Sequence, residues 1–175
     1  MAFLMYDGSM ATEVLLSVEE YLRTSYRPDC DYLDGEVVQR NLGEFDHSSA
    51  QREIVIFFAT RYPHLRKRLL PEQRVQVRLN RYRVPDICIL AADAAGQKII
   101  TTPPGLCIEI LSPEDTLSKT VDRLKDYFGM GVPVCWIVDP VSREGWVATP
   151  GRLEEATDGI LRAAGLEMPL AEVLA

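Results

Sequence analysis

The sequence contains few of the residues that build zinc, disulfide or histidine-rich sites. It has two histidines, His47 and His64, and four cysteines scattered along the chain. Three of the cysteines lie within apolar segments, where a reduced cysteine acts as a small hydrophobic side chain. This arrangement argues against a structural zinc site and against a disulfide framework.

The chain also lacks long apolar runs, linkers and repeats. No segment approaches the roughly 20 apolar residues of a membrane span. The apolar stretch at residues 1–6 is too short for a signal peptide and has no basic flank, so we expect a cytoplasmic protein. No Ser/Gly- or Pro-rich linker divides the 175 residues, so we expect a single domain over residues 1–175.

Positive charge is in short supply, because 19 Lys and Arg face 26 Asp and Glu, for a net charge of −7. This balance argues against nucleic-acid binding by bulk attraction. One region is locally basic, however, since Glu72 is the only acid between Arg61 and Arg83. Such a region is either a solvated face or a phosphate-binding surface.

Local signals predict several elements in the N-terminal half. Ser17 and Glu20 have the spacing of a capping box, which predicts a short helix. Asp34-Gly35 predicts a tight hairpin, with Glu36 first on the returning strand. Residues 48–61 have apolar side chains at helical spacing and are expected to form a buried helix.

The remaining chain alternates predicted strands and helices. The alternating pattern of residues 74–79 predicts a half-buried strand, which we expect to pair with the strand that contains Asp86. A strand is expected at 106–111. A helix should follow it, beginning at Ser112–Asp115 with acids in its first turn and ending at Gly129 and Gly131. The last expected elements are a strand at 134–138, edge strands at 146–148 and 160–162, and a helix at 170–174. Strand, helix and strand in succession imply a right-handed parallel crossover. The fold class is therefore α/β, with a mixed sheet flanked by helices and an N-terminal helix and hairpin.

Two of the predicted strands each carry one carboxylate. Asp86 lies within the apolar segment 84–90, and Glu109 lies within 106–111. A carboxylate in such a position must be paired, protonated or bound to a cation. Two of them on neighbouring strands could hold a hard divalent metal ion. Alternatively, Asp86 caps or turns the strand entrance and Glu109 pairs with a basic side chain.

The order and spacing of several motifs resemble the Uma-two family of restriction endonucleases, within the PD-(D/E)XK nuclease superfamily. The motifs are residues 34–36, His47 before a helix, and residues 70–77, 84–86, 108–115 and 127–140. The resemblance is strongest over residues 21–146. It implies a restriction-endonuclease-like core.

The resemblance also implies a metal site. Mg²⁺ or Mn²⁺ would be held by Asp86 and Glu109, and Glu36 matches a third acidic position of the family. From its sequence context alone, Glu36 could equally be a solvent-facing flank of the hairpin. His47 matches a further family position, which implies a catalytic or metal-shell role; alternatively it caps the helix or packs against it.

The basic residue of the expected site departs from the superfamily pattern. Leu111 stands where the superfamily usually has a lysine, two residues beyond the strand carboxylate. In the family this lysine is displaced onto the following helix, at the position of Arg123. Arginine keeps the charge but cannot accept a proton as a lysine can. Lys125, on the other side of the apolar stripe, competes for the same role.

The leading hypothesis is a metal-dependent endonuclease that hydrolyses phosphodiester bonds of nucleic acid, with DNA as the expected substrate. A homodimer is favoured because double-strand cleavage needs two sites. A second hypothesis is a catalytically inactive module that keeps the fold and binds nucleic acid or a protein partner, which Leu111 and Arg123 favour. A third is a hydrolase of another phosphoester, since carboxylate metal sites do not specify the substrate.

Overall fold

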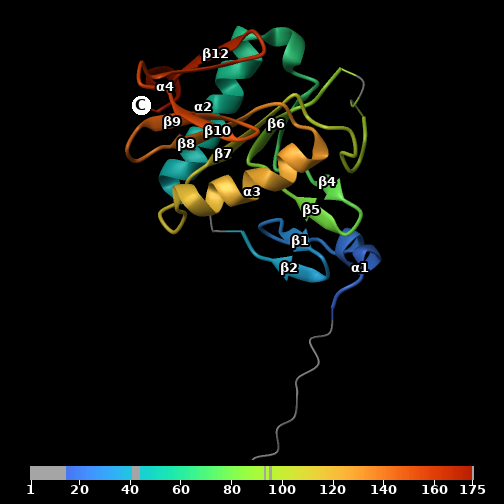
Figure 1. Ribbon diagram of the computed structural model, residues 1–175. Helices are drawn as coiled ribbons and strands as arrows, with labels where there is room; N and C mark the ends of the chain where they lie inside the picture. Colours follow the sequence, from blue (N-terminus) through green and yellow to red (C-terminus); the bar gives the residue numbers. More distant parts are fainter. Residues whose placement is uncertain (1–14, 41–43, 93, 95, 175) are drawn as a thin grey trace, which may run out of the picture.

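The computed structural model describes residues 15–40, 44–92, 94 and 96–174 (Figure 1). The apolar stretch at residues 1–6 lies outside this range. The described chain is a mixed α/β structure with sheets of six, four and two strands and few helices. None of its described helices is long and apolar enough to cross a membrane.

The six-stranded sheet forms the centre of the structure. Its strands, in spatial order, are β10 (Arg152–Glu155), β9 (Glu144–Thr149), β8 (Cys135–Asp139), β7 (Leu106–Ile110), β6 (Ile87–Ile89) and β3 (Leu69–Pro71). β7 and β8 run parallel and are joined through α3 (Leu117–Met130), which confirms that the predicted crossover is a parallel one. The other neighbouring strands of this sheet are antiparallel.

Apolar cores lie on both faces of this sheet. On one face, Ile108 packs with the buried side of α2 (Phe45–Arg61), including Ile54 and Phe58. On the other face, Cys107 packs with Leu124 of α3. Because both faces are covered, every residue of β7 is buried, and its sequence is almost continuously apolar. Glu109 projects on the same face as Cys107, which is the face of α3.

The four-stranded sheet lies on the α3 side of the molecule, together with α1 (Figure 1). Its strands, in spatial order, are β2 (Glu36–Val38), β1 (Asp31–Leu33), β5 (Arg81–Arg83) and β4 (Val75–Arg78). The predicted hairpin is confirmed, because Asp34 and Gly35 have φ angles of 53° and 114°. Positive φ at both central residues is the geometry of a type I′ turn.

The N-terminal helix α1 (Val18–Arg23) is also confirmed, with its capping box. Ser17 and Glu20 satisfy each other's backbone N–H groups at 3.2 Å. Tyr21, fully buried, stacks on Tyr32 with ring centroids 5.0 Å apart and lies beside Tyr82. This aromatic cluster attaches α1 to the four-stranded sheet.

The predicted pairing of strand 74–79 with the Asp86 strand is wrong. β4 instead pairs with β5, while β6 pairs with β3 and β7. Residues 80–82, which that pairing would need as the connection, belong largely to a strand of their own, β5 (Arg81–Arg83), with Tyr82 buried. Its two arginines give the segment no apolar strand pattern. The fold accommodates them because each forms an ion pair with α3.

The predicted start of the helix after Glu109 is also wrong. Ser112 and Asp115 form a turn, in which the Ser112 hydroxyl donates to Asp115 at 2.7 Å. α3 begins only at Leu117, with Thr116 as its cap and no acid in its first turn. At the other end, Gly129 is helical, and Gly131 ends the helix with φ of 107°.

The C-terminal elements differ from expectation in one position. The segment 146–148 was expected at a sheet edge, but β9 lies between β8 and β10. The outer strand β10 has an exposed sequence, RLEE, with a single apolar residue, so it carries no alternation that could reveal it. A separate ribbon of β11 (Ile160–Ala163) and β12 (Leu166–Pro169) precedes the expected helix, α4 (Leu170–Val173). A short 3₁₀ helix, η1 (Pro63–Leu65), follows α2.

The buried cysteines give a first testable prediction. Cys88, Cys107 and Cys135 are register neighbours on β6, β7 and β8, and Cys30 is also buried. Burial raises the pKa of Cys88 to about 12, so its reactive thiolate is scarce at neutral pH. We expect an aromatic disulfide reagent to label no thiol in the folded protein and all four after unfolding in guanidinium. Fast labelling of the folded protein would contradict this packing.

Candidate functional site

The two strand carboxylates lie opposite each other. β6 and β7 are antiparallel, with Ile87 opposite Ile108, so this register places Asp86, the residue before β6, opposite Glu109. The backbone N–H of Ile110 donates to Asp86 Oδ2 at 2.7 Å. Both acids are 1 % exposed. The sheet therefore brings two buried carboxyl groups to one place, as the sequence predicted.

Asp86 is held as an anion by two groups from other elements. Arg40, which follows β2, pairs with Asp86 Oδ1, and His47 Nε2 of α2 lies 3.3 Å from the same oxygen. Burial favours the neutral acid, but the charge of Arg40 and the His47 hydrogen bond outweigh it, and the pKa of Asp86 lies below its ordinary value. Gln51, one turn along α2 from His47, donates to the Asp86 carbonyl at 2.9 Å.

Glu109 receives both of its side-chain partners from α3. Arg123 Nη1 lies 2.6 Å from Glu109 Oε2, and the Tyr127 hydroxyl donates to Oε1 at 2.6 Å. These residues are four apart and therefore share one face of the helix. Burial raises the pKa of Glu109, and although Arg123 opposes this, the neighbouring Asp86 carboxylate adds to it. The two acids thus have pKa values shifted in opposite directions.

An ion-pair network fixes α3 against the four-stranded sheet. Asp126 of α3 accepts from Arg81 at 3.0 Å and from Arg83 at 2.7 Å. Arg83 also pairs with the buried Asp31 at 2.7 Å. Because Asp126 lies between Arg123 and Tyr127 in sequence, these contacts hold the helix that presents both Glu109 partners.

The structure brings together four of the six residues singled out from the sequence. Asp86, Glu109, His47 and Arg123 form one contiguous cluster. Lys125 does not join it: its side chain is 73 % exposed and pairs with Asp122 at 2.5 Å. Of the two basic candidates on α3, Arg123 is therefore the one that reaches the carboxylates.

Glu36 is not brought into this cluster either. It is exposed on β2, where Leu33 is its register partner. Among the described residues, no group of three or more His, Cys, Asp or Glu side chains is arranged to hold a metal ion. Glu36 therefore does not supply a third acid to the Asp86 and Glu109 pair in the described structure.

Sequence reasoning missed one member of the cluster and undervalued another. Arg40 has no motif around it, and its contact with Asp86 depends on where the small sheet lies, so no local signal identifies it. Tyr127 appeared only as part of a family motif. Its helical spacing from Arg123, four residues, is the signal that could have assigned it to Glu109.

The donor chemistry of the site suits a small divalent cation, which prefers carboxylate oxygens. Each of the four carboxylate oxygens already accepts a hydrogen bond or ion pair from the protein. One polar atom of the cluster, His47 Nδ1, is buried without a hydrogen-bond partner. The carboxylate oxygens therefore suit a cation in atom type, although each of them already has a donor within the protein.

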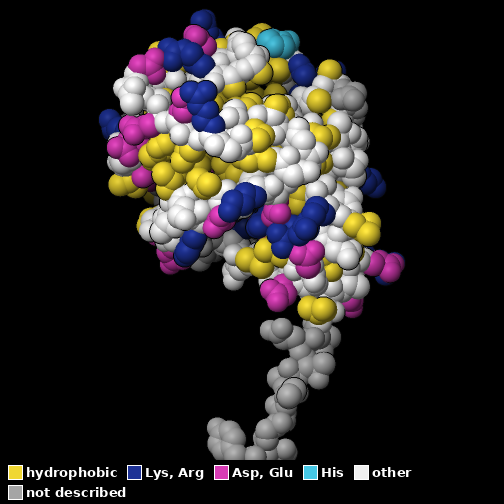
Figure 2. Space-filling view, viewed as in Figure 1, with side chains coloured by type: hydrophobic (Ala, Val, Ile, Leu, Met, Phe, Trp, Pro, Cys, Tyr) yellow, Lys and Arg dark blue, Asp and Glu magenta, His cyan; other side chains and the backbone are white. Residues whose placement is uncertain are grey.

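Much of the locally basic region between Arg61 and Arg83 is neutralised within the fold. Arg74 pairs with Asp29 at 2.5 Å and lies 4.5 Å from the Tyr21 ring centroid. Arg81 and Arg83 belong to the network with Asp126. Basic and acidic side chains accordingly alternate on the face seen in Figure 2 rather than forming a uniform basic surface.

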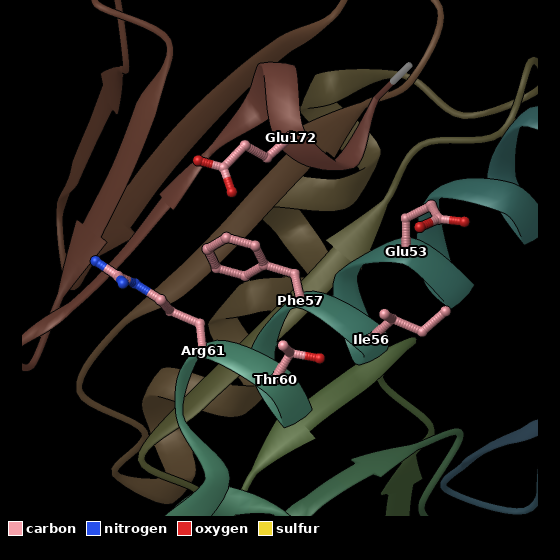
Figure 3. Close-up of a pocket in the computed structure, with 6 residues that line it drawn as sticks. All are labelled: Glu53, Ile56, Phe57, Thr60, Arg61 and Glu172. Atoms are coloured by element: carbon pink, nitrogen blue, oxygen red, sulfur yellow. The ribbon is translucent and has the colours of Figure 1, made fainter.

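A separate groove lies on the outer side of α2, against α4, with a volume of about 420 Å³ (Figure 3). Its lining residues are Glu53, Ile56, Phe57, Thr60, Arg61 and Glu172. His47 and Gln51 approach Asp86 from a different side of α2. The groove is therefore not part of the carboxylate cluster.

Comparison with known proteins agrees with this mixed α/β architecture. A crystal structure from Anabaena variabilis, titled as a "putative nuclease belonging to DUF820", superposes with a TM-score of 0.74 at 22 % identity, covering 89 % of this chain and 96 % of the other. The model of the Uma2 family, described as "Putative restriction endonuclease", matches residues 18–170. The chain belongs to this family. A search of curated proteins finds no match.

Proposed function

We propose that the protein is a metal-dependent endonuclease whose six-stranded sheet is a restriction-endonuclease-like core. The observation that supports this most is the placement of Asp86 opposite Glu109, with Arg123 on Glu109. Two buried acids with pKa values displaced in opposite directions are typical of functional sites. Nucleic acid, with DNA as the first candidate, is the substrate class that family membership suggests.

In this proposal, Asp86 and Glu109 are the ligands of Mg²⁺ or Mn²⁺. Such an ion, when bound, lowers the pKa of a coordinated water and offsets charge on a phosphate. Arg123 stabilises negative charge that develops on the scissile phosphate. It cannot act as a proton acceptor, because a guanidinium stays protonated. Tyr127 holds the orientation of Glu109, and His47 does the same for Asp86.

A second candidate function is a catalytically inactive module that keeps this fold to bind nucleic acid or a protein. It is favoured by one specific observation, the internal donors that occupy all four carboxylate oxygens. It is also favoured by Leu111, which is buried where the superfamily lysine would stand. In that case the arginines serve only to neutralise buried acids.

A cleavage assay distinguishes the two functions. Purified protein is incubated with supercoiled plasmid, single-stranded DNA or single-stranded RNA, with Mg²⁺, Mn²⁺ or a chelator. We expect metal-dependent cleavage that Glu109→Gln abolishes. The matched control, Glu53→Gln, changes an acid on the outer side of α2 and should leave cleavage unchanged. No cleavage of any substrate, or equal cleavage by Glu109→Gln, would favour the inactive module.

The proposal includes a homodimer, since cleavage of both strands of a duplex ordinarily needs two active sites. Analytical ultracentrifugation would measure this directly. Sedimentation as a monomer, together with nicking but no linearisation of plasmid, would contradict the homodimer and would show that the enzyme cleaves one strand at a time.

A further inference from the structure

Arg40 is an unusual member of the carboxylate cluster. Its side chain is only 10 % exposed, and its guanidinium reaches Asp86 Oδ1 from a segment outside any helix or strand, directly after β2. The opposite charge of Asp86 outweighs burial and keeps the pKa of Arg40 above its ordinary value, with a further contribution from Glu109. The arginine is thus a permanently charged cation placed beside both acids.

A cation and Arg40 cannot use the same carboxylate oxygen of Asp86 in the same way. Oδ2 is held by the backbone N–H of Ile110, which is fixed within β7. Oδ1 carries Arg40 and the longer contact from His47. A divalent ion that takes an oxygen from Asp86 would therefore meet the guanidinium at Oδ1, and two positive groups at such short range repel each other strongly in a buried site.

The two arginines of the cluster differ in how easily they can move. Arg123 is part of α3, whose position is fixed by the ion pairs of Asp126. Arg40 lies two residues beyond the end of β2, outside any helix or strand, so no regular element fixes its backbone in the way that α3 fixes that of Arg123. Of the two guanidinium groups, Arg40 is the one suited to leave.

We infer that Arg40 is an internal competitor of the divalent cation: it neutralises Asp86 in the metal-free protein, leaves Asp86 when the metal binds, and so sets the metal affinity. This inference rests on the proposed function. It makes metal binding and the contact of the Arg40 guanidinium with Asp86 mutually exclusive states of one equilibrium, because the ion can bind Asp86 only when Arg40 leaves it.

Calorimetric titration with MnCl₂ tests the inference. We expect Arg40→Met, which keeps an apolar stem but removes the charge, to lower the Kd for Mn²⁺ by about tenfold or more relative to the unaltered protein. Adding Asp86→Asn to Arg40→Met should remove this gain. The matched control is Arg74→Met, because Arg74 is a similarly buried arginine paired with Asp29 rather than with the cluster.

A second measurement uses the unaltered chain, because Arg40→Met leaves Asp86 without its counterion. Phenylglyoxal modifies accessible arginines, and mass spectrometry reports each site. We expect Mn²⁺ to increase modification of Arg40 while that of Arg74 stays constant. Unchanged or decreased modification of Arg40 at saturating Mn²⁺ would overturn the inference.

The outcomes separate this inference from the proposed function. If the unaltered protein binds Mn²⁺ and Arg40→Met binds it no more tightly, the competition is refuted and the metal site stands. If only Arg40→Met binds Mn²⁺, the competition is supported, but the proposed metal site of the unaltered protein fails. If neither binds, both the inference and the proposed metal site fail.

Discussion

Replacing Arg123 with alanine is expected to lower metal-dependent cleavage by about 10²–10³-fold, the usual cost of losing one preorganised electrostatic group. Arg123 lies 2.6 Å from Glu109 and is the basic residue of α3 that reaches the carboxylates. The measurement is the single-turnover rate of plasmid nicking at saturating Mn²⁺, compared with that of the unaltered protein.

Lys125→Ala is the matched control for this variant. Lys125 lies on the same helix but is largely exposed and pairs with Asp122. Its removal should change the rate by less than about twofold, because exposed ion pairs contribute little. Leu111→Lys adds a further test, since a lysine two residues from Glu109 restores the superfamily pattern and should partly rescue Arg123→Ala. A larger loss for Lys125→Ala than for Arg123→Ala would reverse the assignment.

Removing the Asp86 carboxylate is expected to destabilise the metal-free protein by about 3–5 kcal/mol, because Asp86→Ala leaves Arg40 buried beside an empty position. The same change also removes the acceptor of the Ile110 N–H. Chemical denaturation followed by tryptophan fluorescence gives the free energy of unfolding.

Asp158→Ala is the control for this loss, because Asp158 pairs with Arg162 on the surface. We expect it to lower the free energy of unfolding far less than Asp86→Ala does, because exposed ion pairs contribute little. If Asp86→Ala costs no more than Asp158→Ala, Arg40 is not a buried counterion in solution, and the description of the cluster fails with it.

Features of the fold that are encoded over a few residues were predictable from the sequence. The capping box of α1 and the Asp34-Gly35 turn depend only on neighbouring residues, and both are confirmed. The crossover from β7 through α3 to β8 follows from two apolar strands around an amphipathic helix. Strand pairing was less predictable. Two of the three residues of β5 are arginines, so pairing with its neighbouring strands, rather than its own sequence pattern, makes it a strand.

The candidate site was predictable to a similar extent. A carboxylate in an apolar strand signals a partner, and this signal correctly located Asp86 and Glu109 beside each other. It could not name the partner of Asp86, since Arg40 lies 46 residues away in sequence and is brought close only by the packing of two sheets. For Glu109 the expected pairing with a basic side chain is confirmed, because Arg123 of α3 lies 2.6 Å from it.

The locally basic region between Arg61 and Arg83 offers less free positive charge than its sequence suggests. Several arginines of the basic region neutralise acids inside the fold, so they are unavailable to phosphates. Recognition of nucleic acid would therefore depend on the site and on a few exposed residues rather than on a broad basic surface. Binding that is only weakly salt-dependent is what this arrangement favours.

Diffraction from crystals soaked in MnCl₂ would show whether Asp86 and Glu109 together hold a divalent cation. We expect an anomalous peak about 2.1 Å from a carboxylate oxygen of each residue, with the Arg40 guanidinium displaced from Asp86. No peak at this position, with Arg40 still on Asp86 and Arg123 still on Glu109 at saturating Mn²⁺, would contradict it.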